Sequence, residues 1–130
     1  MTASWDRCHN RHGALHRLLD DVESGRRPAR IDWAGASDLH ECFSGLDDVL
    51  SELEMWWTHQ VSAHLDQVFE GLAAIDDDEH GASILQRLRD ARPGLHAVLD
   101  AHRDAAPVVR GKRIERGLLR DAGYRTPATA

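Results

Sequence analysis

Apolar residues recur every three or four positions along most of this chain, which is the spacing of one face of an α-helix. Leucine dominates these positions with 15 residues, whereas the β-branched residues typical of strands are sparse. The pattern therefore predicts an all-α protein, and we expect a four-helix up-down bundle. With 130 residues, the chain suits a single domain, predicted over residues 1–123, followed by a flexible tail over 124–130.

The first predicted helix carries an apolar stripe within the first 22 residues. Its members are Trp5, Cys8, His12, Leu15, Leu19 and Val22. Gly25 stands where a C-terminal cap belongs, so residues 25–37 are predicted to form a loop. We expect Ile31 and Trp33 to pack from this loop onto the bundle.

The second predicted helix is unusually long. Asp38 and Glu41 form an acidic capping pair at its start, and the apolar face continues from Leu39 to Ile75. At a rise of 1.5 Å per residue, a helix over 38–74 would extend about 55 Å, against roughly 30 Å for the first helix. Either the long helix kinks, or its far half packs on the third helix or on another subunit.

The third predicted helix covers residues 78–104 and contains Pro93-Gly94. A proline usually ends a helix, but the three-four spacing continues across this one, so the pattern fits one kinked helix or two short ones. We predict the Pro-kinked helix. Pro107 then suits the first turn of a last helix that ends at Gly123.

Charge divides the chain into two unequal parts. The net charge of −6 combines −11 over residues 1–85 with +5 over residues 86–130. The basic residues crowd the last helix, where they are Arg110, Lys112, Arg113, Arg116 and Arg120. Because no aromatic residue is interleaved to stack a base, and no known motif is present, the pattern argues against a nucleic-acid partner. We expect these residues to face the acidic second helix, in the same chain or in a partner.

The sequence argues against several other classes of protein. No apolar run approaches the 18 residues of a membrane span, and the polar start lacks a signal-peptide pattern. Two cysteines do not make a disulfide scaffold. A glycine-rich phosphate loop, a serine nucleophile elbow and a calcium loop are also missing from the sequence, so no enzyme class is indicated. These observations favour a cytoplasmic protein.

Nine histidines are unusual in a chain of this length, and two of them, His12 and His102, fall on apolar stripes. If successive helices are antiparallel, these two histidines share a layer of the bundle, and Glu54 lies about one turn away. Bundle interiors are where facing helices build imidazole and carboxylate metal sites. A site of His12, His102 and Glu54, completed by His9 or His16, is therefore one hypothesis, with iron or zinc as the ion.

Residues 11–15 (RHGAL), followed by Leu18 and Leu19, loosely resemble the first helix of hemerythrin-type proteins. That resemblance implies a metal site built from histidines and carboxylates on four helices. It covers this segment alone, because neither His59 nor His64 has a glutamate four positions later. No glutamate in the chain is followed three positions later by histidine, the pair that ferritin-like di-iron sites use.

Tryptophan positions point to an interface. Trp57 lies on the apolar stripe level with Trp5, whereas Trp56 points off the stripe, toward Trp33 or a second subunit. We therefore predict Trp56, Trp57 and Trp33 as interface residues. The leading interpretation is a small helical-bundle protein that acts as an interaction or accessory module and forms a homodimer through its second helix. The alternative is the metal-binding bundle.

Overall fold

The computed structural model describes residues 2–69 and 81–123, with side chains described over 10–66 and 85–123. Every regular element within these residues is a helix, which confirms the predicted all-α class. The elements in chain order are α1 (Thr2–Glu23), the 3-10 helix η1 (Trp33–Gly35), α2 (Ser37–His40), α3 (Leu46–Phe69), α4 (Gly81–Ala91), α5 (Pro93–Ala101) and α6 (Ala106–Asp121). None of the described helices is long and apolar enough to cross a membrane.

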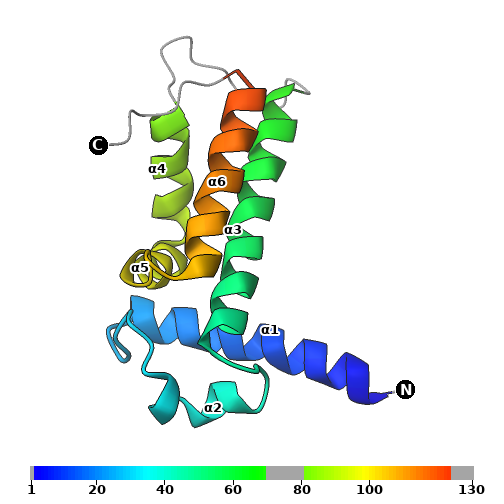
Figure 1. Ribbon diagram of the computed structural model, residues 1–130, viewed down its shortest axis with the longest axis vertical. Coiled ribbons are helices and arrows are strands. Elements are labelled where there is room, and N and C mark those ends of the chain that lie inside the picture. The colour runs from blue at the N-terminus through cyan, green and yellow to red at the C-terminus, as the bar shows by residue number, and fades with distance from the viewer. Residues whose placement is uncertain (1, 70–80, 124–130) are drawn as a thin grey trace.

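The helices form two crossing groups rather than the predicted up-down bundle (Figure 1). Helices α3 and α6 run side by side in the same direction, and α4 runs the opposite way beside them. Helix α1 crosses beneath this group, with α2 on its far side. Because α1 packs mainly on α5, it does not run antiparallel along α3 as the sequence reading assumed.

Helix α1 presents a different face to the core from the predicted one. Its fully buried residues are Ala14, Leu15, Leu18 and Leu19, whereas His12 is exposed. One residue corresponds to a rotation of about 100°, so a core centred on positions 14–15 and 18–19 turns position 12 toward solvent. The assignment of His12 to the core was therefore wrong. The side chains of Trp5 and Cys8 lie outside the described residues.

The long second helix is interrupted between His40 and Leu46, where the chain turns before α3 begins. Asp48 fixes this start, because its carboxylate accepts the backbone N–H of Ser44 at 3.0 Å. Asp38, the predicted cap, pairs instead with Arg27. The predicted continuation over 70–74 lies outside the described residues.

Arg11 ties α1 to this turn. Its two terminal guanidinium nitrogens donate to the two carboxylate oxygens of Asp48, each at 3.1 Å, and its cationic group lies over the Phe43 ring. The hydrogen bonds from Arg11 are the main reason that the pKa of Asp48 is lowered. This bidentate pair fixes the angle at which α1 crosses the start of α3.

The predicted third helix is two helices, so the Pro-kinked helix was wrong and the two-helix alternative is observed. Arg92 leaves the helical region at φ −137° and ψ 69°, and Pro93 takes the first position of α5, where a missing N–H costs little. The N–H of Gly94 then donates to Glu23 Oε1 at 3.0 Å. A Cβ at Gly94 would lie 2.7 Å from the Leu19 carbonyl oxygen, so glycine allows α5 to reach α1.

Two glycines mark helix ends where the sequence predicted them. Gly25 follows α1 with a φ of 78°, and Gly123 follows α6 with a φ of 87°. These left-handed conformations carry little strain in glycine, which explains why both helices stop there. The predicted packing of Ile31 on the core is also confirmed, since this side chain is buried. The predicted tail over 124–130 lies outside the described residues.

Candidate functional site

Charged and polar side chains are buried where α3 meets α6. We call this contact the α3–α6 seam and define it by Glu54, Trp57, Gly111, Lys112 and Glu115. The indole N–H of Trp57 donates to Glu115 Oε1 at 2.6 Å, a short hydrogen bond between two buried groups. Trp57 is 3% exposed, so it belongs to the core and is not available to a partner, contrary to its assignment as an interface residue.

The carboxyl group of Glu54 lies directly against the backbone of Gly111. A Cβ at position 111 would come within 2.0 Å of Glu54 Oε2, so only glycine leaves room for this carboxyl group. Glu54 is 7% exposed, and its Oε2 atom has no hydrogen-bond partner among the described residues. An unpaired buried oxygen disfavours the charged form of the group.

Burial, together with the negative charge of Glu115, raises the pKa of Glu54 to about 7, although Lys112 opposes the shift. The protonated form of Glu54 is therefore favoured to a higher pH than in an exposed glutamate. Among the acidic side chains that the structure describes, Glu54 has the most strongly shifted pKa. Carboxyl groups with strongly shifted pKa values are enriched at functional sites.

His96 of α5 completes the inner side of the seam. Its ring centroid lies 5.2 Å from that of Trp57, and burial lowers its pKa to about 4, with smaller contributions from Arg89 and Lys112. The imidazole is therefore neutral at physiological pH. The cavity that it borders with Glu54 and Trp57 has a volume of about 10 Å³, the scale of one water molecule. Such a cavity cannot admit a substrate.

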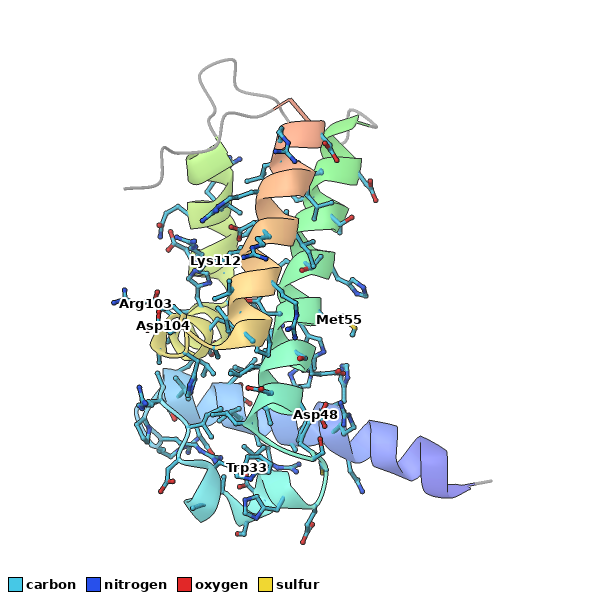
Figure 2. The ribbon with its side chains drawn as sticks, viewed as in Figure 1. Trp33, Asp48, Met55, Arg103, Asp104 and Lys112 are labelled. Carbon is cyan, nitrogen blue, oxygen red and sulfur yellow. The ribbon has the colours of Figure 1, made fainter. Side chains whose placement is uncertain are left out.

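An open groove of about 290 Å³ lies on the outer side of the seam. Met55 and Ile114 flank it from α3 and α6, with 51% and 52% of their surfaces exposed, and Pro107 lines it. Figure 2 shows Met55 projecting outward from α3. Glu54 lines both the groove and the inner cavity, so it separates the outer surface from the buried cluster.

His102 has a structural position away from the seam. Its Nε2 atom accepts the backbone N–H of Ile31 at 3.0 Å, which attaches the loop after α1 to the end of α5. The residue is 8% exposed, and burial lowers its pKa, with a smaller contribution from Arg30. Because Nε2 accepts a hydrogen bond, the neutral ring carries its proton on Nδ1.

Four of the five predicted metal ligands have described side chains, and these four are not assembled into one site, although His12 and His16 lie next to each other. Glu54 lies in the seam, His102 holds the loop, and His12 and His16 are exposed on α1. The side chain of His9 lies outside the described residues. Among the described side chains, no group of three or more histidine, cysteine, aspartate or glutamate residues is placed to hold a metal ion.

The other two predicted interface tryptophans are half-buried in separate places. The Trp56 ring packs against His12 and His16, with centroid distances of 4.7 and 5.0 Å. The Trp33 ring packs against His40 at 4.4 Å, beside α2 (Figure 2). The expected contact between Trp33 and Trp56 is replaced by these histidine contacts.

Sequence reasoning named Glu54, Trp57 and Lys112 in other roles, but missed that they meet Gly111 and Glu115 in one seam. Glu115 and Gly111 carried no signal, because their importance depends on the parallel contact of α3 with α6. Comparisons of the chain with protein-family models, with curated proteins and with solved structures find no match.

Proposed function

We propose that this chain is a cytoplasmic interaction module that self-associates, with a second copy covering the groove outside the α3–α6 seam. The observation that carries the proposal is the pair of half-exposed apolar side chains, Met55 and Ile114, on adjacent helices around one groove. Scattered single apolar residues are normal on a surface, but an apolar pair flanking a groove is typical of a contact site.

The side chains around the groove suit a protein surface as the occupant. Met55 is unbranched and flexible, so it can adjust to an opposing apolar surface. Ile114 supplies exposed apolar area on the α6 side, and the buried Pro107 lines the groove beside it. In a two-fold dimer the same patch occurs on both copies, so each Met55 and Ile114 pair would meet apolar atoms of the other copy.

Unpaired charges support a second copy as the partner. The exposed basic residues of α6 are Arg110, Arg113, Arg116 and Arg120, and none of them is in an ion pair with a described residue. Asp47 and Asp66 on α3 are exposed and likewise unpaired within the described part of the chain. The predicted contact between the two charge groups is thus not made among the described side chains, whereas a second copy offers both signs of charge.

The cytoplasmic assignment rests on a separate observation. Cys42 is a free thiol in a half-buried position, and free thiols persist most readily in reducing compartments. Self-association does not depend on this assignment. It would be tested by expressing the chain with a fluorescent tag in its own cell type and following where the tag is found.

The self-association is tested by multi-angle light scattering on the full chain at micromolar concentration. The wild type is expected at twice its monomer mass of 14.5 kDa. Met55→Glu combined with Ile114→Glu should give a monomer, because each glutamate places a charge in a contact that would be desolvated. Ala34→Glu is the matched control, since Ala34 is exposed in η1, away from the groove.

A wild type that stays monomeric at tens of micromolar would contradict the proposal, as would dissociation by Ala34→Glu to the same extent. Raising the salt concentration should weaken the wild-type dimer, because exposed charge pairs are screened. A monomer that instead binds nucleic acid in a salt-dependent way would assign the basic residues of α6 to a different partner.

A further inference from the structure

An imidazole pair stands exposed on α1, outside the proposed dimer contact. His12 and His16 are four residues apart, so they lie on one side of the helix, one turn apart. Their ring centroids are 5.2 Å apart and the ring planes are inclined at 62°. We propose that His12 and His16 form a surface site for a divalent transition-metal ion such as Zn²⁺, Ni²⁺ or Cu²⁺.

The spacing of the two rings suits a shared ion. Zinc binds imidazole nitrogen at about 2.0–2.1 Å, and the ring centre lies about 1 Å behind that nitrogen, so two rings on one tetrahedral ion have centroids about 5 Å apart. The observed 5.2 Å matches this distance. Binding therefore requires rotation of the rings, with little movement of the helix.

Within the described residues, neither imidazole takes part in a hydrogen bond or an ion pair. The nitrogens of both rings are therefore available to bind an ion. The Trp56 ring packs against both, at 4.7 and 5.0 Å. This contact restricts the rotamers of the two histidines, which reduces the entropy lost when an ion fixes them.

The site would provide two protein ligands, with water molecules filling the remaining positions. This is consistent with the lack of any three-ligand cluster in the described residues. Imidazole is a borderline ligand that favours zinc, copper and nickel over magnesium or calcium. The site borders an open groove of about 430 Å³ that His59 and Gln60 also line, so an ion has free access to it.

One neighbouring charge opposes cation binding. The guanidinium group of Arg92 lies 5.8 Å from the Trp56 ring centroid and lines the same groove. Because Arg92 lines the same groove as His12 and His16, removing its positive charge should strengthen metal binding at low salt. Loss of the same positive charge would weaken binding at an anion site, so this substitution distinguishes a cation site from an anion site.

The experiment uses the full chain without an affinity tag and titrates it with Zn²⁺, Ni²⁺ or Cu²⁺ in a calorimeter. A parallel titration follows tryptophan fluorescence, which Cu²⁺ and Ni²⁺ quench at short range. The wild type is expected to bind one ion, with affinity in the order Ni²⁺ < Cu²⁺ > Zn²⁺. The quenching should be lost in Trp56→Phe, while the binding measured by heat is retained.

His12→Ala and His16→Ala should each weaken binding at least about tenfold, since each removes one of two ligands. His40→Ala is the matched control, because His40 is also an exposed histidine packed on a tryptophan. Arg92→Gln should tighten binding about twofold at low salt. Equal losses in His40→Ala and His16→Ala, unchanged affinity in the two ligand variants, or weaker binding in Arg92→Gln would each overturn the proposal.

Discussion

The contact of α1 with α5 and the α3–α6 seam differ in how completely their buried polar groups are paired. Around α1, Glu23 accepts the N–H of Gly94, and His102 accepts the N–H of Ile31. The four buried side-chain atoms without a hydrogen-bond partner, among the described residues, belong instead to Glu54, His64, Arg89 and His96. Two of these, Glu54 and His96, meet at the seam.

The difference shows which part of the molecule serves the fold and which part is free to serve another purpose. Buried polar groups that are fully paired specify one arrangement, so the α1–α5 contact fixes the crossing of the two helix groups. Unpaired groups cost stability and persist where something else depends on them. In the seam, the unpaired side-chain atoms belong to Glu54 and His96, and Glu54 also lines the exposed groove.

The largest expected effect breaks the α1–α5 contact. Gly94→Ala places a Cβ 2.7 Å from the Leu19 carbonyl oxygen and 2.6 Å from Glu23 Cγ. Because a backbone atom cannot move aside without shifting a helix, we expect a loss of about 3 kcal/mol in the free energy of unfolding. Urea denaturation measures this loss directly.

Two glycines of α6 serve as comparisons for Gly94→Ala. Gly111→Ala should cost less, about 1–2 kcal/mol, because the Glu54 carboxyl group can swing outward into the groove. Gly117 has open space around its Cβ position, so Gly117→Ala should stabilise α6 by about 0.5–1 kcal/mol. If Gly94→Ala proves no more harmful than Gly111→Ala, the contrast between the two regions is wrong.

Removing the His102 imidazole has the next largest effect. His102→Ala leaves the buried N–H of Ile31 without an acceptor and should cost about 2 kcal/mol at pH 7.5. Arg103→Ala, at the exposed neighbouring position, is the control and should leave stability unchanged.

His102 also predicts a response to acid. Its pKa is lowered in the folded state, so the stability that it contributes is present above the unfolded value near 6.5 and is lost as the pH falls below it. The difference in stability between wild type and His102→Ala should therefore shrink between pH 7.5 and pH 5. A constant difference would show that His102 does not titrate in this way.

The smallest expected effect is on the contribution of Glu54 to the free energy of unfolding. This contribution falls as the pH rises, whereas that of His102 falls as the pH drops. Because its folded pKa is raised from 4.5 to about 7, its stabilising contribution is present below 4.5 and is lost as the pH rises to 7. Glu54→Gln cannot ionise, so the wild type should lose about 1–2 kcal/mol relative to this variant between pH 5 and pH 8. Parallel stability curves for the two proteins would contradict the raised pKa.

The sequence predicted the helices better than their connections. Gly25 and Gly123 ended helices as expected, because a left-handed glycine is a local signal. The break at 41–45 was missed, and a kink was preferred to the break at Arg92, because Phe43 within the first break and Leu95 just after the second are buried. An unbroken apolar spacing reports burial, and burial continues when a chain turns within one core.

The candidate site was less predictable because it depends on how helices cross. His12 and His102 were placed in one layer on the assumption of antiparallel neighbours, which the crossing of α1 removes. Glu54 was proposed as a metal ligand beside His12 and His102, whereas its neighbours in the structure, Gly111 and Glu115, belong to α6. Nothing in the spacing of residues indicated that α3 and α6 run in parallel.

The central claim is that a second copy covers the groove outside the seam, and amide hydrogen exchange at two protein concentrations roughly a hundredfold apart tests it most directly. We predict that the higher concentration slows exchange in residues 51–59 of α3 and 107–114 of α6, and leaves α1 and α5 unchanged. Exchange that is independent of concentration, or protection that appears on α1 or α4 instead, would contradict the account.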